Sequence, residues 1–318
     1  MKRTFVLGAL TLAGVITVAA ATVIGQQPPG QGRPGGEGRQ GGRGGGFNFP
    51  PVGKIEKIND KLYWLQGQGG NTAVYVAGNG VVIVDTKLAN NGQAILDQVK
   101  TVTDKPVTHI INTHTHGDHT GSNQFFPASV EIVTQENTAE NMKKMDVFKD
   151  PANKNGLADR TFKDKLTLLS GNDAIDLYYY GAAHTNGDAF IVFRNSRVMH
   201  AGDVFPNKGL PLIDRNNGGS GVAYGETIGK ASKGIKNVDN VITGHSSTLM
   251  KWQDFVDYGE FNRLYLTAAR DALKKGQTPE QAAMEFKLPD KFKDYTITGG
   301  RGGPGGNFGI IFEELGKK

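Results

Sequence analysis

The segment His114-Thr115-His116-Gly117-Asp118-His119 contains three of the seven histidines and one aspartate. It follows a β-branched run over 107–112, so we expect it at the carboxyl end of a buried strand. Gly117 lets the backbone turn tightly, so that alternate side chains can converge. Imidazole and carboxylate are the ligands that zinc accepts where thiolate is absent, and the chain has no cysteine. Four donors in so short a loop exceed what one tetrahedral ion easily takes, which suggests two neighbouring ions.

Three later residues can complete such a site, namely His184, Asp203 and His245. Each follows a short apolar segment with strand character and is next to or near glycine or alanine. Donors at the carboxyl ends of several strands are the usual way in which an α/β sheet assembles a site at one edge. We therefore predict seven metal ligands: His114, His116, Asp118, His119, His184, Asp203 and His245.

The rest of the folded part alternates between strand and helix patterns. Short runs of β-branched and aromatic residues are separated by Gly, Asn or Asp, and longer segments have apolar residues at helical spacing. Strands are predicted at 54–58, 62–65, 73–76, 81–85, 107–112, 165–169, 175–180, 189–193, 198–200 and 240–243, and helices at 89–102, 134–148, 227–235, 252–275 and from Pro279. This order predicts one layered α/β domain over 47–318.

The motif His-x-His-x-Asp-His resembles that of the metallo-β-lactamase superfamily. The following Thr120-Gly121-Ser122-Asn123, the three later ligands and the strand-end Asp85 agree with that resemblance, which covers roughly residues 54–260. It implies a single-domain α/β fold, the four-layer αββα metallo-β-lactamase sandwich, with a metal site along one edge of its two sheets.

The resemblance also implies how two zinc ions would share the ligands. His114, His116 and His184 would hold the first ion, Asp118, His119 and His245 the second, and Asp203 would bridge them. A water shared by two dications loses a proton near neutral pH and becomes a nucleophile. The catalytic role falls to Asp118, which can orient that hydroxide and carry a proton to the leaving group. Iron and manganese remain alternatives, because His and Asp accept all three metals.

Other polar residues have supporting roles or none. Asp85 could hydrogen-bond a ligand histidine or the backbone of the cluster, and His200, three residues before Asp203, could support the ligands. The loop 205–220 is expected to border the substrate pocket. Lys208 in this loop could attract a substrate carboxylate, or it could be solvated. His109 is interpreted as structural.

The ligand set resembles subclass B3 of the metallo-β-lactamases, whereas a bridging aspartate such as Asp203 is found in glyoxalase-II-like thioesterases and in lactonases. We expect an exported binuclear zinc hydrolase that opens a β-lactam or another cyclic amide or ester with a metal-bridging hydroxide. A lactonase or thioesterase is the first alternative. A persulfide-dioxygenase-like oxidoreductase, holding one iron through His114, His184 and Asp203, is the second, and a metal-binding protein without turnover is the third.

The amino-acid composition limits the class of protein and the partners that we expect. With 37% apolar and 21% charged residues, the chain is neither a multi-span membrane protein nor wholly disordered. Most of the formal charge of +5 comes from the first 46 residues. The remainder offers no basic face, so the expected partner is a small-molecule substrate and not nucleic acid. The sequence does not indicate an oligomeric state.

The first 25 residues have the pattern of a secretory signal peptide. Lys2-Arg3 precedes an apolar run over 5–24 with small residues at its end. An uncleaved anchor is the alternative, since twenty apolar residues could span a bilayer. We expect cleavage, a periplasmic or secreted domain, and no stable membrane association afterwards. Residues 26–46 form a Gly/Pro/Arg-rich segment without aliphatic side chains, which predicts a disordered linker. A similar Gly-rich loop is predicted at 299–309, before the apolar tail 310–312.

Overall fold

The computed structural model describes residues 49–297 and 305–316. These residues belong to one compact unit, Asn48–Lys318. The predicted signal peptide (1–25), the predicted linker (26–46) and residues 299–304 of the predicted Gly-rich loop lie outside the described residues.

Two sheets form the centre of this unit. In the first sheet, the strands follow one another in chain order; β1 to β4 are antiparallel, and β4 to β7 are parallel. Its strands are β1 (Glu56–Lys57), β2 (Leu62–Leu65), β3 (Thr72–Val76), β4 (Val81–Val84), β5 (Val107–Ile111), β6 (Glu131–Gln135) and β7 (Arg160–Phe162).

The second sheet has the order β13-β12-β11-β10-β9-β8, and β11 and β12 are its parallel pair. Its strands are β8 (Lys165–Leu168), β9 (Ile175–Tyr178), β10 (Phe190–Phe193), β11 (Val198–His200), β12 (Asn240–Ile242) and β13 (Met250–Lys251). The α-helices are α1 (Gly92–Lys100), α2 (Gly117–Thr120), α3 (Glu136–Met142), α4 (Tyr224–Gly234), α5 (Trp252–Lys274), α6 (Pro279–Glu285) and α7 (Gly306–Gly316).

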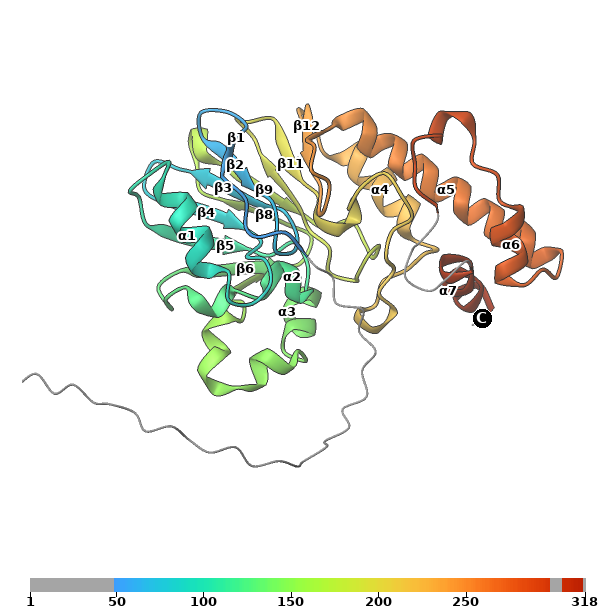
Figure 1. Ribbon diagram of the computed structural model, residues 1–318, viewed down its shortest axis with the longest axis horizontal. Helices are drawn as coiled ribbons and strands as arrows, with labels where there is room; N and C mark the ends of the chain where they lie inside the picture. The colour runs from blue at the N-terminus through green and yellow to red at the C-terminus, as the bar shows by residue number, and fades with distance from the viewer. Residues whose placement is uncertain (1–48, 298–304, 317–318) are drawn as a thin grey trace, which may run out of the picture. The chain divides into compact units, whose positions relative to one another are not determined.

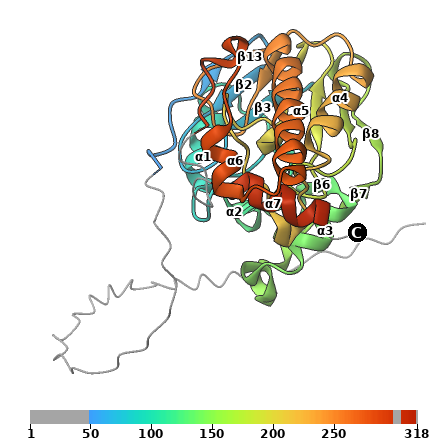
Figure 2. The same ribbon diagram turned by 90° about the vertical axis from the view of Figure 1, so that its right-hand side faces the viewer.

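The alternation of side chains along each strand builds the layers. Val82 and Val84 of β4 lie in one apolar cluster with Ile191 and Phe193 of β10, so this cluster fills the space between the sheets. The intervening Val81 and Ile83 pack with α1. On the second sheet, Phe190 and Val192 pack against α4 and α5. The outcome is the αββα sandwich that the sequence predicts (Figures 1 and 2).

The predicted helix over 134–148 is wrong at both ends. β6 continues to Gln135, α3 covers only Glu136–Met142, and a 3-10 turn (Asp146–Lys149) follows. Val133 and Thr134 are buried between β5 and β7, whose pairing selects the extended conformation that these β-branched residues favour. Three strands, β6, β7 and β13, were not predicted from the sequence; β7 has three residues and β13 has two.

The predicted loop over 299–309 is wrong in its last part, because α7 begins at Gly306. Phe308 and Ile311 of α7 pack against Tyr265 and Leu266 of α5, and this tertiary contact stabilises a helix where glycine disfavours one. α6 and α7 lie beside α5 (Figure 2). Among the described helices, none is both long and apolar enough to cross a membrane.

Candidate metal centre

The seven predicted ligands lie together at the edge where strands of both sheets end. The segment 114–119 follows β5 and leads into the short helix α2, Asp203 lies in a 3-10 turn (Gly202–Val204) after β11, and His245 follows β12. The structure brings the residues together as two groups, in each of which the potential ligand atoms lie within 4.8 Å of one another. The first group is His114, His116, His184 and Asp203, and the second is Asp118, His119 and His245.

Asp203 lies between the two groups. Its Oδ2 is 3.6 Å from Nε2 of His184, in the first group, and 3.2 Å from Nε2 of His245, in the second. Its Oδ1 is 3.3 Å from Nε2 of His119. Within the first group, Nε2 of His184 is 2.9 Å from Nδ1 of His116. Asp203 is therefore within reach of histidines from both groups.

Three buried atoms at this centre, Nε2 of His114, Nε2 of His119 and Oδ1 of Asp203, have no hydrogen-bond partner. Burying a polar atom without a partner is costly, so natural proteins avoid it. Lone pairs of imidazole and carboxylate that converge without donors are what a divalent cation requires. The donor set therefore fits a metal site.

Four of the candidate ligand histidines, namely His114, His116, His119 and His184, have a partner for the outward-facing ring nitrogen. Nδ1 of His119 lies 2.7 Å from the Asp85 carboxylate, and Nδ1 of His114 lies 3.0 Å from the Thr113 hydroxyl. Nδ1 of His184 donates to the Leu212 carbonyl at 2.7 Å, and Nε2 of His116 donates to Oδ2 of Asp214 at 2.7 Å. Such contacts fix the orientation of a ligand ring and which nitrogen carries the proton.

Asp85 connects this arrangement to the first sheet. It is fully buried, accepts hydrogen bonds from the backbone N–H and the hydroxyl of Thr113, and contacts His119. The contact between Asp85 and a ligand histidine that the sequence analysis considered is therefore present. Asp214 was not predicted to contact a ligand, because nothing in the local sequence distinguishes this aspartate from others in loops.

His200 and Lys208 lie in different surroundings. His200 is buried, donates from Nε2 to the Asn71 carbonyl at 3.0 Å, and accepts from the Gly202 backbone N–H through Nδ1 at 3.1 Å. It thus fixes the turn that carries Asp203. The Lys208 ammonium forms an ion pair with Asp254 at 2.7 Å. Its contact with substrate stays a prediction.

The protonation states of the side chains at this centre favour the binding of a cation. Burial lowers the pKa of His114 and lowers that of His184 to about 4, so both imidazoles are neutral at pH 7 and keep a free lone pair. Burial alone would raise the pKa of Asp203, but the positive charge of nearby His245 and His119 holds it well below its usual range. Burial would likewise lower the pKa of His119, yet the carboxylates of Asp203, Asp85 and Asp118 raise it. These carboxylates thus favour positive charge at the centre.

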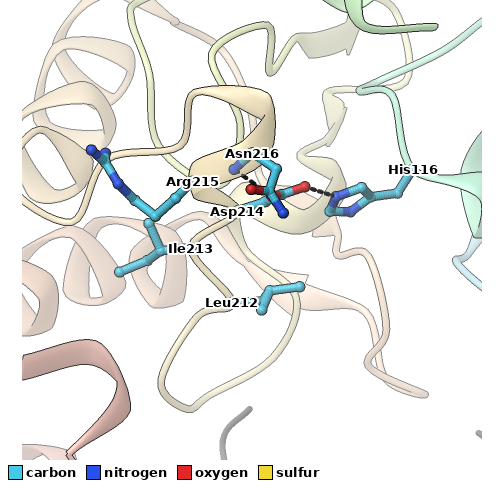
Figure 3. A pocket seen from close by; sticks show the side chains of 6 residues that line it. All are labelled: His116, Leu212, Ile213, Asp214, Arg215 and Asn216. Carbon is cyan, nitrogen blue, oxygen red and sulfur yellow. Dashed lines mark hydrogen bonds and ion pairs between the residues drawn. The ribbon is translucent and has the colours of Figure 1, made fainter. Parts of the chain in front are cut away.

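A cavity of about 400 Å³ adjoins the centre at His116. Leu212, Ile213 and Asp214 line it together with Arg215 and Asn216. Figure 3 shows the side chains of Asp214 and His116 pointing toward each other, while that of Arg215 extends away from both. A cavity of this size suits a small-molecule substrate.

Gly70 is a position where any side chain would disturb the centre. A Cβ here would overlap the imidazole of His119, with Nδ1 of that ring only 2.6 Å away. His119 cannot retreat, because it is buried and held by Asp85. Gly70→Ala is expected to lower the free energy of unfolding by about 1–3 kcal/mol, the usual cost of overpacking, and to reduce metal content.

Urea unfolding and metal analysis would check this expectation, with Gly53→Ala as the control. A Cβ on Gly53 would meet its nearest atom, the Gln66 carbonyl oxygen, at an ordinary 3.6 Å. Equal stability of the two variants would show that His119 has more room than this geometry indicates.

Comparison with known proteins defines the class. The sequence profile of the Metallo-beta-lactamase superfamily matches residues 65–261, which is more than half of the chain and includes every predicted ligand. The chain therefore belongs to the metallo-beta-lactamase superfamily. The superfamily that the sequence predicts is thereby confirmed.

Solved structures share the fold at low sequence identity. The stereoselective inverting sec-alkylsulfatase Pisa1 from Pseudomonas sp. is 16% identical with a TM-score of 0.69, and the match covers 83% of this chain and 50% of that chain. The DIM-1 metallo-beta-lactamase is 18% identical with a TM-score of 0.54, covering 67% and 99% respectively. A metallo-beta-lactamase from Pontibacter korlensis is 17% identical with a TM-score of 0.54, covering 66% and 99%. The chain thus spans half the length of the alkylsulfatase.

Proposed function

We propose that this protein is an exported binuclear zinc hydrolase that cleaves a carbonyl-centred bond in a small molecule, with a β-lactam or another cyclic amide or ester as the first substrates to test. The observation that carries the two-metal proposal is the position of Asp203. Its two oxygens approach histidines of both groups, and Oδ1 has no hydrogen-bond donor.

The two groups of side chains support the division of ligands that the resemblance implies. His114, His116 and His184 would hold one zinc ion, Asp118, His119 and His245 the other, and Asp203 would contact both. When bound, zinc supplies Lewis acidity toward the scissile carbonyl and lowers the pKa of a water molecule. This proposal includes both the identity of the metal as zinc and the number of two ions per chain. Iron and manganese are the alternative metals.

Asp118 is the residue best placed for proton transfer. Its side chain is 22% exposed, whereas that of His119 is fully buried, so Asp118 is accessible from the solvent side of the centre. Its Oδ2 lies 3.4 Å from Nε2 of His245. A carboxylate there can accept a hydrogen bond from the attacking water, orient it, and pass a proton to the leaving group.

The cavity next to His116 would bind the substrate. Leu212 and Ile213 offer apolar contact, and the Asp214 carboxylate is already occupied by His116 and by the Asn217 amide. Arg215 is neutralised by Glu314 at 2.8 Å. Among the described residues, the lining therefore offers no free cation, which favours a substrate that binds through its apolar part.

Hydrolysis of a secondary alkyl sulfate ester is a second candidate. It is favoured by one observation: the likeness to the sec-alkylsulfatase covers 83% of this chain, compared with 67% for DIM-1. The lactonase, thioesterase and mononuclear-iron dioxygenase alternatives stand beside it.

The test measures turnover and metal content on the same samples. Protein purified without added metal would be assayed with a chromogenic β-lactam, a lactone, a thioester and a secondary alkyl sulfate. We expect about two zinc ions per chain and turnover of a carbonyl substrate. One iron per chain would contradict the hydrolase mechanism in favour of the dioxygenase, and turnover of the sulfate alone would replace the substrate class.

We also propose that the protein is periplasmic or secreted, with residues 1–25 removed as a signal peptide. The support is the Lys2-Arg3 pair before the apolar run over 5–24. Fractionation of cells that express the full chain, followed by N-terminal sequencing, tests this proposal. A soluble extracytoplasmic product that begins near residue 22 or 26 is expected, and an intact N-terminus in the membrane fraction would favour the uncleaved anchor.

A further inference from the structure

Residues 211–222, which we term the ligand loop, contact two of the histidines from outside. The Leu212 carbonyl accepts from Nδ1 of His184, and the Asp214 carboxylate accepts from Nε2 of His116. The Asp214 side chain is itself held, since it caps the following 3-10 turn (Arg215–Asn217) and accepts from the Asn217 amide at 2.6 Å. The position of this loop therefore sets the orientation of two rings at the metal centre.

On the centre's side, the loop is bonded to the backbone around His184. The Asp214 N–H donates to the His184 carbonyl and the Ser220 N–H donates to the Ala183 carbonyl, both at 2.9 Å. These bonds join the loop to residues next to the ligands. The Asn217 carbonyl also accepts from the Asn186 N–H at 2.9 Å and from the side chain of Asn141 in α3 at 3.4 Å.

On the other side, the C-terminal helix α7 holds the loop. Asn307 donates to the Pro211 carbonyl at 2.9 Å, at the beginning of the loop. Glu314 accepts four hydrogen bonds from the loop, one from Arg215 and three from residues 220–222. Its Oε1 accepts from Arg215 and from the Gly221 N–H, and its Oε2 accepts from the Ser220 hydroxyl and the Val222 N–H.

The Glu314 side chain is only 10% exposed, so this carboxylate has exchanged water for four loop donors. Hydrogen bonds to a charged, largely buried acceptor are stronger than neutral ones. Phe308 and Ile311 of α7 pack against α5, so the helix that carries Glu314 is held in place. A series of contacts thus leads from α5 through α7 and the ligand loop to His116.

We propose that Glu314 is a positioning residue of the metal centre, which holds the ligand loop so that Asp214 and Leu212 keep His116 and His184 in their binding orientation. This inference rests on the proposed function in one respect, namely that these histidines bind zinc. Glu314 does not touch the centre and acts through Asp214.

The test compares Glu314→Gln with Glu313→Gln. Glutamine retains one acceptor oxygen but presents an amide group to two of the four donors. Glu313 is an exposed neighbour on the same helix, without a hydrogen bond or ion pair to the described residues, so its variant carries the same charge change. Zinc affinity is measured by competition with a chromophoric chelator. Glu314→Gln is expected to lower the zinc affinity of one site by about tenfold, which is the lower limit of the usual effect of removing a residue that supports a metal ligand. Glu313→Gln is expected to have the zinc affinity of the wild type.

A double-mutant cycle tests the route through Asp214. If Glu314 acts through this residue, Glu314→Gln on an Asp214→Asn background should weaken zinc binding little beyond Asp214→Asn alone. Independent, additive effects would overturn the proposal. A lower melting temperature with unchanged zinc affinity in Glu314→Gln would also overturn it, because Glu314 would then stabilise the fold without positioning a ligand.

A readout without metal separates this inference from the proposed function. In the metal-free protein, NMR of the histidine ring protons should show the Nε2 proton of His116 protected from exchange in the wild type and exchanging faster in Glu314→Gln. Were the wild type to bind no zinc, the proposed function would fail, yet this measurement would still decide whether Glu314 positions His116. Ser220→Ala removes one of the four donors and serves if Glu314→Gln does not fold; unchanged His116 exchange in it would contradict the proposal.

Discussion

Asp118→Asn is expected to lower kcat by 10²–10⁴, which corresponds to about 3–5 kcal/mol of transition-state stabilisation, while metal content falls far less. Asparagine keeps an oxygen that can ligate a cation but loses the charge needed to accept a proton. The partly exposed carboxylate, 3.4 Å from His245, is placed both to ligate and to orient the attacking water. Removing it should therefore affect the reaction more than the binding of metal.

The measurement pairs kcat with elemental analysis of the same preparations. The control is Asp254→Asn, because this aspartate lies outside the centre, where it pairs with Lys208 and accepts from the Lys251 backbone N–H. We expect this variant to retain wild-type metal content and turnover. Full activity in Asp118→Asn would show that another group orients the water.

His116→Ala and His245→Ala are each expected to remove about one zinc ion per chain and nearly all activity. His116 belongs to the group around His184, and His245 to the group around His119, so each truncation leaves the other group of ligands in place. Because Asp203 contacts both groups, the remaining site should bind its ion more weakly than in the wild type.

Titration of the metal-free protein with zinc, followed by calorimetry, distinguishes the two sites. Two binding events in the wild type and one in each variant are the expected result. His109→Ala serves as the control, since the His109 ring pairs with Glu131 on the first sheet. A wild type that never exceeds one ion at excess zinc would refute the binuclear site.

Several strands could be predicted from the sequence because the residues within each strand determine its conformation. Val81–Val84 and Phe190–Phe193 are apolar runs of strand length, and both are fully buried strands. The boundary between β6 and α3 could not be predicted, since it depends on pairing with β5 and β7. Likewise, α7 is stabilised by its packing on α5, which glycine-rich local sequence does not indicate.

The seven candidate ligands were visible in the sequence because four of them lie within six residues and each of the others follows a strand by three to six residues. Strands that run in the same direction in a sheet end at the same edge, so position along the chain already implies proximity. The contacts that orient these ligands were not visible. Asp214 meets His116 across 98 residues, and Glu314 meets Arg215 across 99. Which loop reaches which ring depends on how the layers pack, and only the folded chain decides that.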